Sequence, residues 1–78
     1  MGETAGNNDK VNQQNELSKR ELEMLKEIAN GLSSQQLSEK YFISLDTVET
    51  HRKNIIKKLD AENMMHAVAI AIRKKIIE

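Results

Sequence analysis

The chain has 78 residues, no cysteine, two histidines, and 12 acidic and 12 basic side chains, so its formal net charge is zero. This length fits a single domain, and the lack of cysteine excludes a disulfide framework and a thiolate metal site. The absence of proline and an aromatic content of only 3% favour helices over a sheet. No apolar run approaches the roughly 20 residues that span a bilayer, so we expect a cytoplasmic protein with no membrane contact.

The zero net charge hides an uneven distribution of charged residues. Acidic residues gather between positions 16 and 27, whereas basic residues form clusters at positions 52–58 and 73–75. Because salt screens charges over about 8–10 Å, a local cluster can decide what a surface attracts. The net charge therefore does not exclude a polyanionic partner.

Residues 1–15 contain a single large aliphatic side chain, Val11, among glycine, asparagine, glutamine and charged residues. Such a segment buries too little apolar surface to offset the entropy lost on ordering. We predict a disordered tail or an interdomain linker, or, at its very start, a remnant of an expression vector. The folded domain is predicted over residues 16–78.

A first helix is predicted to begin at Ser18. Ser18 is an N-cap, Glu21 three residues later completes a capping box, and Leu17 can act as a hydrophobic staple against Leu22. Apolar residues then recur at helical spacing until Gly31, which ends the helix as a left-handed C-cap.

The second and third predicted helices are joined by a very short connection. Ser33 caps a short helix that ends near Tyr41, with Leu37 and Tyr41 facing inward. Ser44 caps a longer helix that extends to about Leu59. Two helices joined so tightly must cross at a steep angle, which predicts a helix-turn-helix motif.

The third predicted helix divides into two faces when its residues are placed at about 100° intervals. Val48, Ile55 and Leu59 form a core stripe, with His51 and Arg52 at its edges. The opposite face is polar throughout and contains Asp46, Glu49, Thr50, Lys53 and Lys57. An ordinary solvated face is one interpretation. The second helix of such a pair is, however, the position of a recognition helix, and basic residues flank it where phosphates would lie.

A fourth helix is predicted from about Met64 to Ile77, with Asn63 as its N-cap, and it is apolar on nearly all sides. One stripe consists of Met64, Ala67, Val68 and Ala71. The other consists of Met65, Ala69, Ile72 and Ile76. A terminal helix of a small domain buries only one face, so the second stripe is either a poorly covered core or a partner surface. We favour a dimer contact.

The order of short motifs along residues 17–77 is specific. It runs "LSKRELEML", "IANGLS", "IS" and "TV" two residues apart, "H", "NI", "KL" and finally "AVAIA". This order resembles the LuxR/NarL-type (GerE-like) helix-turn-helix domain, the output module of many bacterial response regulators and quorum-sensing activators. The resemblance implies an all-α four-helix domain whose third helix enters the DNA major groove and whose fourth helix dimerises.

Carried over position by position, the resemblance assigns base reading to Glu49, Thr50 and Lys53. It assigns contacts with the DNA backbone to Thr47, His51, Asn54, Lys57 and Lys58. Lysine can donate to guanine O6 and N7, a threonine methyl can pack on thymine, and a glutamate can accept from cytosine N4. The alternative for Glu49 is an ion pair with Lys53 at i+4. Asp46 is expected to stabilise the helix start through the macrodipole.

The sequence departs from the family pattern in two places. Asp60-Ala61 replaces the usual Gly-Val, but aspartate tolerates the left-handed conformation, so we expect the turn to survive. Met64 and His66 replace the usual Arg and Glu early in the fourth helix. This replacement is expected to weaken the capping box and to affect the dimer geometry.

The sequence therefore predicts sequence-specific double-stranded DNA binding by the output domain of a bacterial transcription regulator of response-regulator type. The domain is expected to bind as a homodimer on half-sites about one helical turn apart. RNA polymerase is a further partner consistent with this class. No catalytic constellation, metal site or cofactor is predicted, because His51 and His66 alone do not make a closed site. The alternative is a helical protein-interaction module that docks through the fourth helix.

Overall fold

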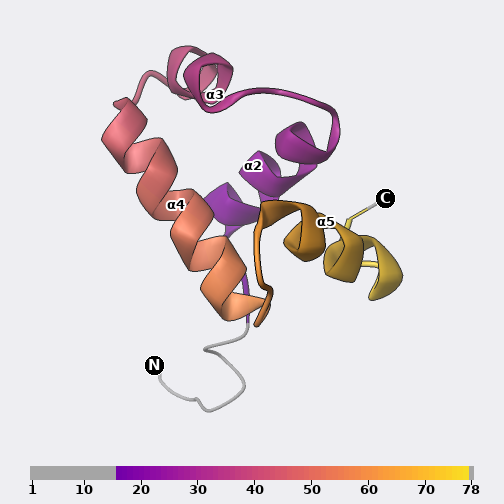
Figure 1. Ribbon diagram of the computed structural model, residues 1–78. Coiled ribbons are helices and arrows are strands. Elements are labelled where there is room, and N and C mark those ends of the chain that lie inside the picture. Colours follow the sequence, from indigo (N-terminus) through magenta and orange to yellow (C-terminus); the bar gives the residue numbers. More distant parts are fainter. Residues whose placement is uncertain (1–15, 78) are drawn as a thin grey trace, which may run out of the picture.

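The computed structural model of the protein describes residues 16–77, and this part of the chain contains four helices and no strand. They are α2 (Lys19–Ala29), α3 (Ser34–Tyr41), α4 (Leu45–Lys58) and α5 (Met64–Arg73). In Figure 1, α4 runs along one side of the molecule, α3 lies near its start, and α2 and α5 lie beside it. The predicted all-α four-helix fold is confirmed, and the predicted tail lies outside the described residues. None of the helices in residues 16–77 has the length and apolar character needed to cross a membrane.

All four helices begin at the N-cap residues that the sequence predicted. Ser18 Oγ accepts from the Glu21 amide at 3.1 Å, and Glu21 Oε1 accepts from the Ser18 amide at 2.8 Å, which completes the predicted capping box. Ser33 and Gln36 form a second capping box, of which only the serine cap was predicted. Each such cap satisfies a helix-end N–H and stabilises a helix by about 1 kcal/mol.

Every helix is followed by a residue with positive φ, which turns the chain. Gly31 has φ 101° after α2, Phe42 has φ 57° after α3, and Asp60 has φ 56° after α4. The turn at Asp60 therefore survives the loss of the family's glycine, as expected.

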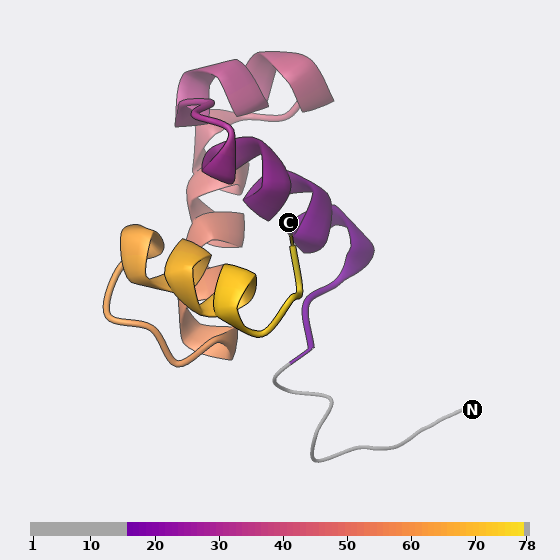
Figure 2. The ribbon, with the colours of Figure 1, turned by 90° about the vertical axis from the view of Figure 1, so that its right-hand side faces the viewer.

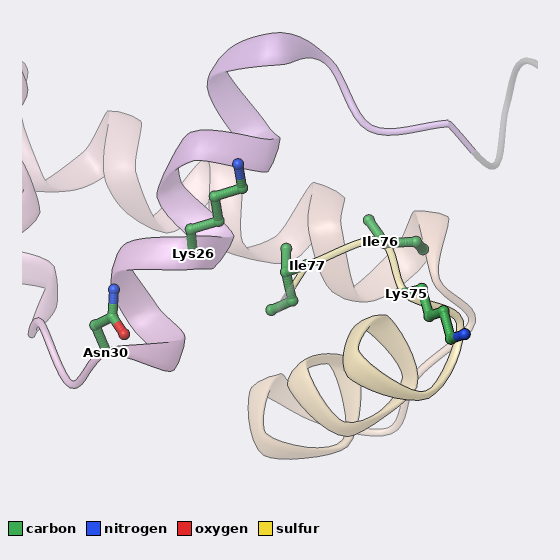
Figure 3. Close-up of a pocket in the computed structure, with 5 residues that line it drawn as sticks. All are labelled: Lys26, Asn30, Lys75, Ile76 and Ile77. Carbon is green, nitrogen blue, oxygen red and sulfur yellow. The ribbon is translucent and has the colours of Figure 1, made fainter.

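The end of α5 differs from the prediction, because this helix stops at Arg73 rather than at Ile77. Lys75, with φ 61°, reverses the chain, and the amides of Ile76 and Ile77 then donate to the Ala71 carbonyl at 2.8 and 3.4 Å. Ile77 is only 3% exposed. Figure 3 shows the segment with Ile76 and Ile77 running back from the end of α5 toward Lys26 on α2 and its C-cap residue Asn30. The chain leaves the helix because the reversal buries an isoleucine.

The core consists of two groups of buried side chains. The smaller group joins Met24, Leu37 and Val48. The larger group joins Leu25, Ile55, Leu59, Ala67, Ala71 and Ile77. Helices α2 and α4 contribute to both groups, α3 only to the smaller and α5 only to the larger. Figure 2, turned by 90°, shows α3 and α5 at opposite ends of this arrangement. As a result, α4 is held along its whole length.

The turn between α3 and α4 is fixed by two hydrogen bonds between Ser38 and Ile43. Ser38 Oγ donates to the Ile43 carbonyl at 2.6 Å, and the Ile43 amide donates to the Ser38 carbonyl at 3.1 Å. Phe42, which lies between them, is 92% exposed. The turn is therefore held by its backbone and a serine hydroxyl, and not by burial of its aromatic side chain.

Candidate nucleic-acid interface

Helix α4 has one buried face and one exposed polar face, as its sequence predicted. Val48 and Ile55 are fully buried, and His51 and Arg52 at the edges of the core stripe are half-buried. The residues of the opposite face are all exposed: Asp46, Glu49, Thr50, Lys53 and Lys57. These five residues are called the polar stripe below.

Two of the predicted base-reading residues are arranged for different kinds of contact. Thr50 Oγ1 donates to the Asp46 carbonyl at 3.0 Å within its own helix, so its hydroxyl is occupied and its methyl remains for apolar contact. Lys53 forms no ion pair with any residue in the described range 16–77. Its ammonium group is therefore available to an acceptor outside the domain.

Glu49 does not form the ion pair with Lys53 that was considered as its alternative role. Its Oε1 lies 3.9 Å from Arg52 Nε, at i+3 instead of i+4. Half of the Glu49 side chain is exposed, and a pair of this kind contributes at most about 1 kcal/mol. The contact draws the Glu49 carboxylate toward Arg52, which lies next to the polar stripe at the edge of the core.

The predicted backbone-contacting residues Thr47, His51, Asn54 and Lys58 follow one another at intervals of three and four positions. They therefore form a line along one edge of α4, between the core and the polar stripe. Thr47 Oγ1 lies 2.9 Å from Ser44 Oγ, and Asn54 is exposed. Lys57 lies apart from this line, in the polar stripe.

Lys58 is engaged by the protein itself. Its Nζ lies 2.8 Å from Glu21 Oε1, and this oxygen also accepts from the Ser18 amide. The Glu21 residue is only 4% exposed. Burial opposes ionisation of this carboxyl, but the hydrogen bonds from Lys58 and Ser18 and the positive charge of Lys58 outweigh it, and the pKa of Glu21 lies below its ordinary value. The pair ties the end of α4 to the start of α2.

This pair was not predicted from the sequence, because the two residues are separated by 37 positions. The only local signal was the capping box, which explains why Glu21 is present but not that it has a second partner. Lys57, the neighbouring lysine, is exposed and has no ion pair within residues 16–77. The two lysines, which were predicted to act alike, therefore lie in different environments.

Helix α5 buries the first of its two predicted stripes. Ala67 and Ala71 are fully buried, whereas Met65 is 84% and Ile72 50% exposed. Ala69 is exposed as well, so three members of the predicted dimer contact lie on a free face. Ile76 does not share this face, because it lies beyond the end of the helix and packs against the larger core group.

The start of α5 is capped despite its departure from the family pattern. Asn63 Oδ1 accepts from the His66 amide at 2.8 Å, and His66 Nδ1 accepts from the Glu62 amide at 3.0 Å. The His66 ring therefore accepts from the amide before the N-cap and not from the N-cap amide itself. Helix α5 keeps its N-cap bond but lacks the reciprocal bond of a capping box, as expected. In the same described range, no three His, Cys, Asp or Glu side chains gather in a way that could hold a metal ion.

Comparison with known proteins identifies the family. Residues 15–71 match the family model described as "Bacterial regulatory proteins, luxR family". Over 62 residues, the chain is 44% identical to the oxygen regulatory protein NreC of Staphylococcus haemolyticus and 42% identical to that of Staphylococcus carnosus. Each alignment covers 80% of this chain and 29% of the relative, so the chain spans less than a third of the length of these curated relatives.

The family match includes the whole helix-turn-helix motif and most of α5. The chain therefore belongs to the luxR family of bacterial regulatory proteins, and its fold is that of a DNA-binding output domain of a transcription regulator.

Proposed function

We propose that this domain binds double-stranded DNA sequence-specifically, with α4 in the major groove. The observation that carries the proposal is the polar stripe, all of whose residues are exposed, on the second helix of a helix-turn-helix. In this motif the second helix lies in the major groove with its first residues at the base edges. Charged and polar side chains on that face are in position to contact bases.

Three residues of the polar stripe are proposed to read bases. Lys53, which has no ion-pair partner within residues 16–77, donates to guanine O6 or N7. Thr50 presents its methyl to a thymine methyl, because its hydroxyl is bonded to its own helix. Glu49 accepts from cytosine N4 once its weak contact with Arg52 is released.

Backbone contacts are proposed for Thr47, His51 and Asn54 along the edge of α4, and for Lys57 near its end. Lys58 is assigned a different role from the one that its sequence position suggested. Because it holds the buried Glu21 carboxylate, it positions α4 on α2 and does not serve primarily as a phosphate ligand.

A homodimer on DNA is proposed to form through Met65, Ala69 and Ile72 of α5. Exposed apolar side chains grouped on one helix face are typical of interaction surfaces. Ile76 is not included in this contact, because its side chain is partly buried against the larger core group. The relatives are considerably longer regulators, and we propose that this domain is the output part of such a response regulator.

Binding of fluorescently labelled duplex DNA, followed by anisotropy at two salt concentrations, tests the proposal. Affinity should fall steeply with salt, because each phosphate contact releases counterions. Lys57→Ala should weaken binding to all sequences alike, whereas Glu49→Ala should change which sequences are preferred. An affinity that is independent of salt would contradict the proposed phosphate contacts.

Thr50 offers a matched pair of variants for the base-reading face. Thr50→Val keeps a methyl group at the same place, and Thr50→Ser removes it but keeps the hydroxyl. If the methyl group reads thymine, only Thr50→Ser should lose the preference for that base, by roughly 1–3 kcal/mol. Equal preferences in the two variants would remove Thr50 from the base-reading set.

The alternative function, a protein-interaction module that docks through α5, is favoured by the 84% exposure of Met65. Chemical-shift perturbation with random duplex DNA separates the two functions. Shifts concentrated on residues 46–58 support DNA binding. Shifts that appear only on residues 64–77, and only with a protein partner, support the alternative.

A further inference from the structure

One atom on α4 has an unusual environment. Nδ1 of His51 is enclosed by the protein and has no hydrogen-bond partner, and no other buried side-chain nitrogen or oxygen among residues 16–77 is left unpaired in this way. The His51 residue as a whole is only half-buried. Nε2 is not enclosed in the same manner, and no described residue bonds to it. The ring therefore turns one nitrogen toward the interior and leaves the other open.

This orientation distinguishes the two tautomers of the neutral ring. A neutral imidazole carries one proton, either on Nδ1 or on Nε2. A proton on Nδ1 would bury an N–H donor without an acceptor, which folded proteins rarely tolerate. An unpaired buried acceptor is found more often. The enclosure of Nδ1 therefore favours the tautomer with its proton on Nε2.

The tautomer determines whether His51 can bind a phosphate. With the proton on Nε2, the open nitrogen is a donor; with the proton on Nδ1, it would present a lone pair, which repels a phosphate oxygen. His51 lies between Thr47 and Asn54 on the edge of α4 that is proposed to follow the DNA backbone. We infer that the His51 ring in its neutral form carries its proton on Nε2 and donates this N–H to a DNA phosphate, which positions α4 in the groove. This inference rests on the proposed function.

The tautomer can be measured on the DNA-free protein, independently of any binding. Long-range ¹H–¹⁵N NMR spectra at pH 8.5, above the range in which histidine ordinarily titrates, distinguish a protonated ring nitrogen from an unprotonated one. We expect the protonated nitrogen of His51 to be Nε2. A protonated Nδ1 would overturn the inference even if DNA binding is confirmed.

Two variants test the phosphate contact. The amide nitrogen of His51→Gln can reach the place of Nε2, whereas that of His51→Asn falls near the place of Nδ1. We expect His51→Gln to keep its affinity within about threefold and His51→Asn to lose roughly tenfold, the size of one hydrogen bond to a charged group. Lys57→Ala is the contrasting variant, because removal of a lysine should reduce the salt slope of binding.

The outcomes separate the inference from the proposed function. If the unaltered protein binds DNA with the expected salt dependence but the two His51 variants bind equally well, the histidine contact is wrong and the proposed function stands. If the unaltered protein shows no salt-dependent binding, the proposed function fails, and the phosphate contact with it. Thermal unfolding of both variants identifies any loss of affinity that is caused by unfolding.

Discussion

Helices α4 and α5 pack into the same core group and differ in what they leave exposed. Ile55 from α4 and Leu59, the C-cap of α4, meet Ala67 and Ala71 from α5 in the larger group. The outer face of α4 is the polar stripe, whereas the outer face of α5 carries Met65 and Ile72, 84% and 50% exposed.

This difference shows how the two helices can share a core and still face different partners. A polar face is stable in water and can exchange its solvent for a polyanion. An exposed apolar face gains free energy only when other apolar surface covers it. The inner faces therefore account for the fold, and the outer faces account for the proposed division between DNA and a second copy of the chain.

The largest loss of stability is expected from a substitution in the core group that α4 and α5 share. Ile55→Ala should lower the free energy of unfolding by about 2–5 kcal/mol, because it removes a fully buried side chain and leaves a cavity. Urea denaturation followed by circular dichroism measures this loss. Thr50→Ala, on the opposite face of α4, should stay within about 0.5 kcal/mol of the unaltered protein. Similar losses in the two variants would contradict the assignment of the inner and outer faces.

The next largest effect should distinguish two adjacent lysines of α4. Lys58→Ala should cost about 1–3 kcal/mol of stability, because the buried Glu21 carboxylate loses a charged partner. Lys57→Ala, the matched control, should leave stability almost unchanged and reduce the salt slope of DNA binding by about one. Equal stability of the two variants in urea denaturation would show that the Glu21–Lys58 pair does not hold α4.

The same pair should make the fold sensitive to acid. The folded-state pKa of Glu21 lies below its ordinary value, so its contribution to stability is present above the unfolded-state pKa of about 4.3 and is lost as the pH falls through the lower folded-state pKa. Urea denaturation at a series of pH values should show that Glu21→Gln differs most from the unaltered protein near pH 7. The difference should shrink below about pH 4. A difference that is independent of pH would mean that the charge of Glu21 is not what stabilises the fold.

A substitution on the outer face of α5 should alter assembly and spare the fold. Ile72→Arg should change stability by no more than about 0.5 kcal/mol, because half of the side chain is already exposed. It should weaken binding to duplexes with two half-sites and leave binding to a single half-site unchanged, as anisotropy can show. Loss of binding to both duplexes would contradict the assignment of this face to a dimer contact alone.

A small effect of opposite sign, a gain in stability, is expected at the turn that precedes α4. Phe42→Gly should raise the free energy of unfolding by up to about 1 kcal/mol, because glycine removes the left-handed strain at φ 57° and the lost side chain is 92% exposed. Thermal and urea unfolding measure the change. A clear destabilisation would show that Phe42 contributes packing despite its exposure.

Much of the fold could be predicted from the sequence, because the interactions that determine it join residues close together in the chain. The N-caps Ser18, Ser33, Ser44 and Asn63 each bond to an amide three residues away, and the faces of α4 follow from its periodicity. The second capping box, Ser33 to Gln36, was equally local and could have been found by the same rule. The assignment to the luxR family also needed only the order of motifs in the sequence.

The sequence by itself determined the four helix starts, the buried and polar faces of α4, and the apolar character of α5, because these depend on residues within one or two helical turns. Only the tertiary structure decided that Ile77 leaves α5 to reach the core, and that Lys58 but not Lys57 meets Glu21. It also decided that Glu49 contacts Arg52 rather than Lys53, and that Nδ1 of His51 is buried without a hydrogen-bond partner. Helical spacing permits a partner at i+3 or at i+4, so the periodicity of the sequence does not select between Arg52 and Lys53 for Glu49. The contacts of Ile77 and Lys58 join residues that are far apart in the sequence, so local patterns do not reveal them.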